Sequence, residues 1–316
     1  MSQVIVIGAG NWGRNLVRTF YDLGALASVV EEDEVTRQQL HEVYPEIHFY
    51  PNVQVALLDD APAVVVATPA PTHFYITKAA LLAGKDVFVE KPLTLCSQEA
   101  QELVDLAEKQ ERLLMVGHLL LYQPAIRKIK EAIEDGLIGS LQGLHQERLK
   151  LGRIRSVENV LWSFGVHDIA VLLYLTDEQP ASIQVTGQPI VQSTIEDDVY
   201  LHLYFKSGVQ AHLHTSWYWP EIRRHLVVTG SEGMLVYDEE QQTVVLHRKA
   251  INTDLSNKEE GSVLLYRGEA KPLTLECQHF LTCVQERQRP FSDGNNGLNV
   301  IRILEEASRM LRRERI

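Results

Sequence analysis

Cysteine is scarce in this 316-residue chain, which contains only Cys96, Cys277 and Cys283. Three thiols scattered in this way exclude a disulfide framework and a cysteine-based metal site. Long apolar runs are lacking too: the stretch Leu113–Tyr122 is interrupted by a glycine and a histidine and is shorter than the roughly 20 residues that span a bilayer. The N-terminus carries no signal-peptide pattern. We therefore expect a reducing, cytoplasmic setting and no membrane partner.

Basic residues are fewer than acidic residues in this chain. Lysine and arginine number 30 against 42 aspartates and glutamates, which gives a formal net charge of −12, and the two signs are interspersed. This balance excludes nucleic acid as a general partner, although a local basic cluster could still bind a phosphorylated ligand. The chain is rich in apolar residues, at 45%, and is long enough for two domains with a core each.

Residues 1–119 alternate short β-branched runs with amphipathic helical stretches. This alternation predicts an α/β Rossmann domain, in which helices cover a doubly wound parallel sheet. Gly84 is placed to end a helix over Thr72–Ala83, and Ser97 is placed to cap the start of the next helix. The expected strands are Val4–Ile7, Ala27–Val30, Ala63–Ala67, Asp86–Glu90 and Leu113–Val116.

In residues 120–316 the hydrophobic period changes to two. Val199, Leu201, Leu203 and Phe205 are apolar, whereas tyrosines and a histidine occupy the positions between them. This pattern predicts an α+β domain with a largely antiparallel open sheet. The other expected elements are strands at Leu141–Leu149, Ala181–Pro189, Val209–Trp217, Arg224–Thr229, Met234–Asp238 and Thr243–His247, helices at Glu276–Gln288 and Leu298–Arg313, and a mobile loop at 252–272.

A glycine-rich turn follows the first strand and opens the first helix. Gly8 allows a tight turn, Gly10 lets a pyrophosphate approach the backbone, and Gly13 allows the helix to pack closely on the strand. Asn11 and Trp12 lie between these glycines, at a helix N-terminus whose free N–H groups favour phosphate. The order of strand, glycines and helix predicts a dinucleotide site, although flavin and S-adenosylmethionine sites use similar glycines.

Glu31 ends the second strand, 23 residues after Gly8. A carboxylate at this point can accept hydrogen bonds from both ribose hydroxyls and repels a 2′-phosphate, so we expect NAD as the cofactor. Three further acids, Glu32, Asp33 and Glu34, follow directly. Glu31 can therefore also be interpreted as a solvated loop carboxylate.

Two polar segments follow later strands of the parallel sheet. Thr68, Pro69 and His73 come after the third expected strand, and Glu90-Lys91-Pro92 ends the fourth, where an open sheet presents its ligands. Together with the glycine motif, these segments resemble the Gfo/Idh/MocA oxidoreductase family, whose members share a Glu-Lys-Pro element at this position. The resemblance implies an NAD(P)-dependent dehydrogenase acting on CH–OH groups, with both segments at the cofactor.

The resemblance extends over nearly the whole chain. Gly117-His118 with Tyr122 and Pro124 matches the family's domain junction, and the run Leu161–Asp168 matches its second catalytic element. It implies substrate contacts at His118 and Tyr122, although His118 can equally be a structural histidine. The family commonly has an acid four residues before the histidine of the second element, and here that position is Ser163. This departure puts in doubt a mechanism with two acid/base groups besides the lysine.

Oxidation of a carbinol requires that the hydroxyl lose its proton as hydride leaves the carbon. A neutral imidazole, with a pKa of about 6.5, can take that proton, so we expect His167 to be the base and Lys91 to hydrogen-bond the same oxygen. A helix N-terminus at His167 would favour the neutral ring. Alternatively, His167 is a capping or buried histidine, and Asp168 is expected to orient it or to cap the helix.

Arg153, Arg155 and Arg223 are candidate anion binders, since arginine makes bidentate contacts with phosphate. With Asn159, their segments resemble the branch of the family that acts on UDP-N-acetylglucosamine derivatives, although they can equally be an ordinary charged surface. This resemblance implies a nucleotide-sugar substrate oxidised or reduced at C3. The alternatives are a free-sugar or cyclitol dehydrogenase and a sensor that binds dinucleotide and ligand without turnover.

Several histidines fall on one face of a predicted hairpin. If Phe205 pairs with Val209, His202 lies opposite His212 on the face shared with His214, an arrangement that could imitate a metal site. We expect no carboxylate on that face of the two strands, and the chemistry needs no metal. The family resemblance implies instead that the open sheet face joins copies of the chain in a homodimer or homotetramer.

Overall fold

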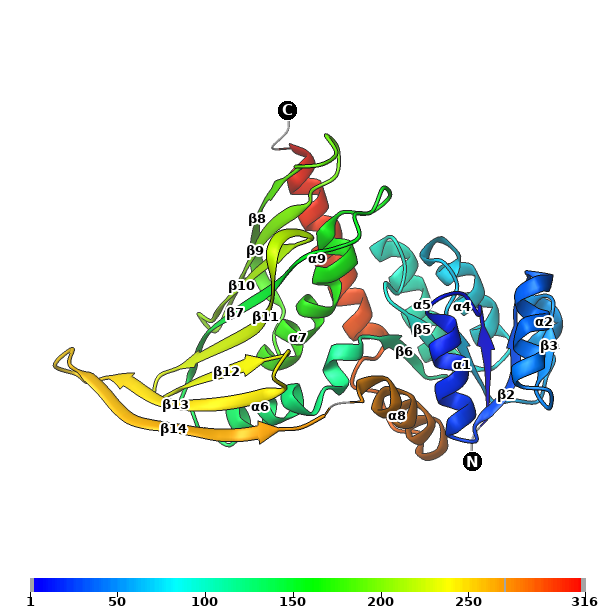
Figure 1. The fold of residues 1–316 in the computed structure, drawn as a ribbon, viewed down its shortest axis with the longest axis horizontal. Coiled ribbons are helices and arrows are strands. Elements are labelled where there is room, and N and C mark those ends of the chain that lie inside the picture. Colours follow the sequence, from blue (N-terminus) through cyan, green and yellow to red (C-terminus); the bar gives the residue numbers. More distant parts are fainter. Residues whose placement is uncertain (1–2, 270, 314–316) are drawn as a thin grey trace. The chain divides into compact units, whose positions relative to one another are not determined.

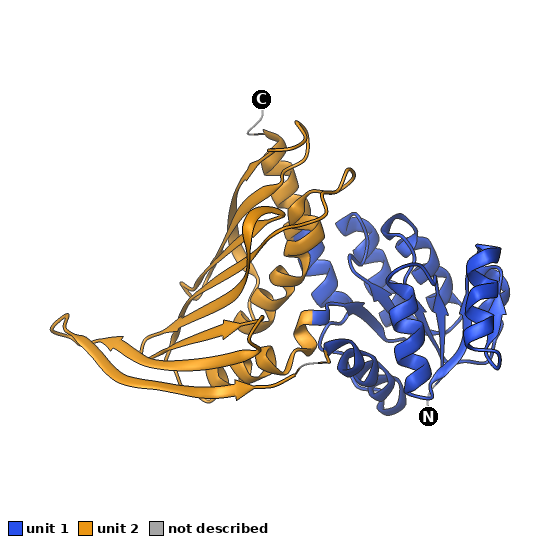
Figure 2. Cartoon of the chain, in the orientation of Figure 1, with its two compact units in different colours: residues 1–119, 272–302 blue, residues 120–271, 303–316 orange. Residues whose placement is uncertain are grey.

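The computed structural model describes residues 3–269 and 271–313. The chain divides into two compact units, one formed by residues 1–119 and 272–302 and the other by residues 120–271 and 303–316 (Figure 2). The sequence places residues 272–302 in the second domain, but in the structure they pack with the first unit. Their side chains complete its core: Phe280 packs edge-on against Phe88, with ring centroids 5.6 Å apart.

Six parallel strands form the sheet of the first unit, in the order β3-β2-β1-β4-β5-β6 (Figure 1). Their β-branched residues are buried because helices pack against the sheet. The predicted doubly wound parallel sheet is confirmed, and it gains the short edge strand β3. The strands are β1 (Val4–Ile7), β2 (Leu26–Val30), β3 (His48–Tyr50), β4 (Ala63–Val66), β5 (Asp86–Glu90) and β6 (Leu114–Gly117).

The two helices that the sequence marks with Gly84 and Ser97 in the first unit are present, α4 over His73–Leu82 and α5 over Ser97–Lys109. Gly84 has a φ of +73° two residues after the end of α4, as expected of a glycine that ends a helix. The predicted cap at Ser97 is wrong, because α5 begins at Ser97 and Cys96 holds the cap position. The helices are α1 (Gly13–Asp22), α2 (Glu34–Val43), α3 (Val53–Ala56), η1 (Ala70–Thr72), α4 (His73–Leu82), α5 (Ser97–Lys109) and α8 (Pro272–Glu286). The turn η2 (Leu119–Tyr122) begins at the last residue of 1–119 and continues into the second unit. None of the described helices is both long and apolar enough to cross a membrane.

Eight strands form the sheet of the second unit, in the order β14-β13-β12-β11-β7-β10-β9-β8. Neighbours are antiparallel except β7 and β10, which confirms a largely antiparallel sheet. The strands are β7 (Leu141–Leu151), β8 (Pro180–Gln188), β9 (Asp198–Phe205), β10 (Gln210–Ser216), β11 (Tyr218–Gly230), β12 (Met234–Asp238), β13 (Thr243–Ile251) and β14 (Asn257–Arg267). The helices are α6 (Pro124–Glu134), the π-helical turn η3 (Leu161–Gly165), α7 (Val166–Thr176) and the end of α9 (Gly294–Arg313).

The predicted β9–β10 register is confirmed. Phe205 pairs with Val209 through the backbone, and His202 lies opposite His212. The expectation of a face without carboxylates is wrong, because β9 begins one residue earlier than predicted, at Asp198, whose carboxylate lies 3.2 Å from His214 Nε2. Within the described ranges, no group of three or more histidine, cysteine or acidic side chains is arranged to hold a metal ion.

The loop expected at residues 252–272 is wrong for much of its length. Strand β14 occupies Asn257–Arg267 and pairs antiparallel with β13. The strand could not be predicted from the sequence because it lies at the edge of the sheet. Residues 257–264 are all exposed, so they do not alternate between apolar and polar residues. Ion pairs such as Lys249–Glu259, at 2.7 Å, join the two strands instead.

Candidate functional site

The glycine loop joins β1 to α1 in the first unit. Gly8 has a φ of +91°, and a Cβ added to Gly13 would lie 2.1 Å from the Gly8 carbonyl oxygen. Both positions therefore require glycine for the shape of the turn. Gly10 differs, because a Cβ there would meet no atom within 4 Å. Its bare backbone borders open space at the start of α1, where a phosphate can approach the helix N–H groups.

The carboxylate of Glu31 lies on this glycine loop. Its Oε2 accepts the Ala9 N–H at 2.9 Å and its Oε1 accepts the Asp33 N–H at 3.0 Å. The guanidinium of Arg37 donates to the Glu31 carbonyl oxygen at 2.7 Å. Glu31 is therefore fixed beside the phosphate loop, unlike a freely solvated carboxylate, and a carboxylate in this place fits a ribose with free hydroxyls. The loop and Glu31 together fit NAD.

Glu90 ends β5 with its carboxylate buried against the glycine loop. Trp12 Nε1 donates to Oε1 at 2.5 Å, and the Lys91 N–H donates to Oε2 at 3.2 Å. Burial raises the pKa of Glu90, while the Trp12 hydrogen bond and the Lys91 charge lower it. Glu276 of α8 is fully buried, and burial and the charge of Glu90 raise its pKa well above the usual range. Because Glu90 has the two donors, we assign the negative charge of this pair to Glu90.

His73, at the start of α4, joins the loops that follow β4 and β5. Its Nδ1 lies 2.7 Å from the Pro92 carbonyl oxygen and its Nε2 lies 2.9 Å from the Thr68 carbonyl oxygen. Burial lowers the pKa of His73, while the contacts with the Pro92 and Thr68 carbonyl oxygens raise it. Both ring nitrogens thus face the backbone, and the ring fixes the Lys91–Pro92 segment, whose peptide bond is cis, beside Thr68.

His118 follows β6 and is 1% exposed. Burial and then the positive charge of Lys91 lower the pKa of His118 to about 3. Its imidazole is therefore neutral at physiological pH. The first unit thus brings Lys91 together with two buried imidazoles and the carboxylate of Glu90.

His167 lies in the first turn of α7 in the second unit. The π-helical turn η3 precedes it, and the small size of Gly165 is needed there, since a Cβ would lie 2.7 Å from Leu161 Cδ1. π-Helical turns are frequent at functional sites. The helix does not start at His167 as expected: Val160, Gly165 and Val166 all have right-handed helical backbone, so the helical segment already runs through η3 before it reaches His167.

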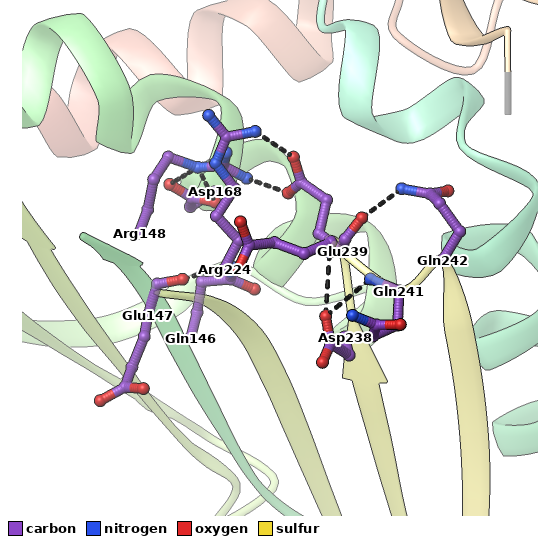
Figure 3. A network of polar contacts seen from close by, with 10 residues as sticks. Gln146, Glu147, Arg148, Asp168, Arg224, Asp238, Glu239, Gln241 and Gln242 are labelled. Carbon is purple, nitrogen blue, oxygen red and sulfur yellow. Dashed lines mark hydrogen bonds and ion pairs between the residues drawn. The ribbon is translucent and has the colours of Figure 1, made fainter. Parts of the chain in front are cut away.

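Asp168, the next residue, is engaged elsewhere. Both of its oxygens accept from Arg148 Nε at 2.9 Å. Arg148 and Arg224 in turn bind Glu239 at 2.9 and 3.0 Å (Figure 3). Burial raises the pKa of Asp168 to about 6 although Arg148 opposes the rise, so the carboxylate is ionised at pH 7. Both oxygens of Asp168 are thus engaged by Arg148, and the expectation that Asp168 orients His167 or caps α7 stays a prediction.

The arginines singled out in the sequence lie on the surface of the second unit. Arg153, Arg155 and Arg223 are exposed. Arg155 lies 3.7 Å from Glu158, and Arg223 lies 3.6 Å from Glu221. Their contact with a ligand stays a prediction, whereas Arg148 and Arg224, which the sequence analysis did not select, form the ordered network of Figure 3.

Asn159 and Tyr122 have structural neighbours. The Asn159 side chain accepts the Trp162 N–H at 3.2 Å and donates to Glu196 at 2.8 Å, so it supports the start of η3. Tyr122 is 5% exposed at the end of η2. Substrate contacts of these two residues also stay predictions.

Comparison with known proteins gives the same family for both parts of the chain. Residues 2–118 match the model of the GFO/IDH/MocA oxidoreductase family, NAD-binding Rossmann fold, and residues 126–236 match the GFO/IDH/MocA C-terminal domain. UDP-N-acetylglucosamine 3-dehydrogenase of Acidithiobacillus ferrooxidans is 27% identical over 301 residues, which cover 94% of this chain and 93% of that protein.

The solved structure of that Acidithiobacillus enzyme superposes with a TM-score of 0.86 at 24% identity and covers 98% of this chain and 97% of its own. Inositol 2-dehydrogenase of Serratia proteamaculans is 28% identical over 188 residues, which cover 57% of this chain and 56% of that protein. The similarity to the first enzyme therefore extends over both units, and the similarity to the second over little more than half the chain.

Proposed function

This chain belongs to the Gfo/Idh/MocA family of NAD-binding oxidoreductases, and we propose that it transfers hydride between NAD and C3 of a UDP-N-acetylhexosamine derivative. The dehydrogenase activity follows from the family. The observation that supports this choice of substrate is the similarity, over 94% of the chain, to UDP-N-acetylglucosamine 3-dehydrogenase.

The first unit holds the residues that would bind NAD. The Gly10 backbone and the N-terminus of α1 offer N–H groups to the pyrophosphate, and the fixed carboxylate of Glu31 accepts from the ribose. The Trp12–Glu90 hydrogen bond, at 2.5 Å, ties the glycine loop to the end of β5. When bound, the nicotinamide accepts or supplies the hydride.

Two side chains carry the proton chemistry in this proposal. His167 takes the proton of the reacting hydroxyl in oxidation and returns it in reduction, and Lys91 donates a hydrogen bond to the same oxygen and stabilises its developing negative charge. The place of His167 directly after the π-helical turn η3 supports this role. Because Ser163 stands where the family commonly has an acid, His167 is the single proton acceptor.

A cyclitol dehydrogenase is the second candidate function. The matches to inositol 2-dehydrogenases support it, although they cover 57% of the chain. Such a substrate has no nucleotide, so binding of UDP separates the two candidates.

The test is a substrate comparison with two readouts, NAD reduction and melting temperature. We expect NAD reduction with UDP-N-acetylglucosamine or its uronate, no reduction with myo-inositol, and an increase in melting temperature on addition of UDP. Turnover of myo-inositol without any effect of UDP would replace the first candidate with the second.

A further inference from the structure

The helix-facing side of β7 becomes polar toward the end of the strand. Leu144 is fully buried and Gln146 is 6% exposed, and Arg148 and Lys150 follow at the same side-chain parity. The neighbouring strand β11 places Arg224 directly opposite Arg148. Three cations, Arg148, Lys150 and Arg224, therefore lie at the carboxyl end of β7, on a side of the sheet that is ordinarily apolar where it is buried.

The carboxylates of this region neutralise only two of the three cations. Arg148 and Arg224 bind Asp168 and Glu239 at 2.9–3.0 Å, which makes a neutral group of four charges. Among residues 3–269 and 271–313, no carboxylate lies within ion-pair distance of the Lys150 ammonium. The local charge beside the network is therefore one positive unit in excess.

The position of Lys150 is fixed by packing. Its Nζ lies 5.1 Å from the centroid of the Phe164 ring. Gly152 leaves room for the aliphatic stem, because a Cβ there would lie 3.1 Å from Lys150 Cε and 3.3 Å from Phe164 Cζ. Burial lowers the pKa of Lys150, and the positive charges of Arg224 and Arg148 lower it further.

We propose that the Lys150 ammonium binds an anionic group of the substrate, a carboxylate or a phosphate. A half-buried cation attracts an anion more strongly than an exposed lysine does, because the surroundings screen it less. Phe164 precedes His167 by three residues in the continuous η3–α7 segment, so this anion lies next to the segment that carries the proposed base. The inference rests on the proposed function, and it adds that the substrate of that reaction carries a negative charge bound by Lys150.

Two kinds of sugar substrate carry such an anion, and binding probes distinguish them. Isothermal titration of the NADH complex uses UDP for a nucleotide phosphate, D-glucuronate for a sugar carboxylate and D-glucose as the uncharged control. Lys150→Met removes the charge at nearly constant length. Lys206→Met, in the exposed turn before β10, is the matched control.

We expect one anionic probe to bind about tenfold more weakly to Lys150→Met, with wild-type affinity in Lys206→Met and partial recovery in Lys150→Arg. Gly152→Ala, which displaces the Lys150 stem, should weaken the same probe. A loss confined to UDP assigns a phosphate, and a loss confined to D-glucuronate assigns a carboxylate. Equal affinities in wild type and Lys150→Met, or no anion binding by the wild type, would overturn the inference. Because no turnover is measured, this result is separate from the substrate test of the proposed function.

Discussion

At the residue scale, the reaction depends on Lys91 as a donor to the reacting oxygen. Lys91→Met should lower kcat by about 10²–10⁴-fold, because the developing alkoxide loses its hydrogen bond, while NADH affinity stays near the wild-type value. Steady-state kinetics and NADH fluorescence titration measure the two quantities. Lys78→Met, which removes an exposed lysine paired with Glu102, should leave both unchanged. Full turnover in Lys91→Met would exclude this mechanism.

His118 makes stability depend on pH in a defined direction. Its pKa of about 3 in the folded state lies below the usual value of about 6.5, so the unfolded chain binds the proton first as the pH falls. Its stabilising contribution is complete above pH 6.5 and is lost progressively toward pH 3. Between pH 7 and pH 5 the wild type should lose about 2 kcal/mol of unfolding free energy that His118→Gln does not lose. Urea unfolding at both pH values measures this, and equal losses would contradict a buried neutral His118.

Asp168 is predicted to stabilise the second unit. Asp168→Asn leaves the buried Arg148 without half of its negative partners and should lower the unfolding free energy by about 3 kcal/mol. Glu134→Gln, which removes an exposed carboxylate 3.4 Å from Lys130, should cost about 0.5 kcal/mol at most. Denaturant unfolding at pH 7.5 compares them, and similar small changes in both variants would mean that the network of Figure 3 contributes little.

The glycines could be predicted from sequence because their partners are local: Gly8 and Gly13 meet each other within one turn. Glu31 could be predicted because it stands at the end of the strand that follows the glycine motif, although its partner Ala9 is 22 positions away. The network around Asp168 could not, because Arg148 and Glu239 lie 20 and 71 positions away and adjacent arginines at 223 and 224 face different sides. Glu276 was missed for the same reason, since its relation to Glu90 exists only after α8 packs on the first unit.

At the scale of elements, two glycines of the β1–α1 turn have different roles: Gly13 is needed for the structure of the turn, and Gly10 faces the space where the ligand would bind. Gly13→Ala should lower both stability, by about 1–3 kcal/mol, and NADH affinity, because its Cβ meets the Gly8 carbonyl oxygen. Gly10→Ala should leave the stability of the apoprotein unchanged and still weaken NADH, since its Cβ enters the open space that the pyrophosphate needs. Thermal unfolding and NADH titration distinguish the two, and identical behaviour of the variants would contradict this division.

Periodicity predicted the elements whose two sides differ in burial. It found β9 and β10, where residues such as Leu201 are buried and Tyr200 is 42% exposed. It failed at β14, because residues 257–264 are all exposed and do not alternate between buried and exposed positions. It also failed at β3, which has only three residues. These two edge strands lack the asymmetric burial on which the pattern depends, whereas the edge strand β8, in which Ile183 and Val185 are buried, has it and was predicted.

At the scale of the whole molecule, the first unit needs a segment from the far end of the chain. Phe280 completes the core at Phe88, and Ser292 donates to the Val116 carbonyl oxygen at 2.6 Å. A fragment of residues 1–119 should therefore expose apolar surface and fail to bind NADH, whereas residues 1–119 linked to 272–302 should bind it. Dye binding and NADH fluorescence measure this, and full NADH affinity in the short fragment would contradict the role of α8.

The central claim, hydride transfer between a nucleotide sugar and NAD, is tested most directly by isotope transfer. The protein is incubated with NAD and UDP-N-acetylglucosamine, or its uronate, carrying deuterium at C3, and the reduced cofactor is analysed by mass spectrometry. The account predicts NADD one mass unit heavier than NADH, formed together with the 3-keto sugar nucleotide. Unlabelled NADH from either substrate, or no reduced cofactor with both, would contradict it.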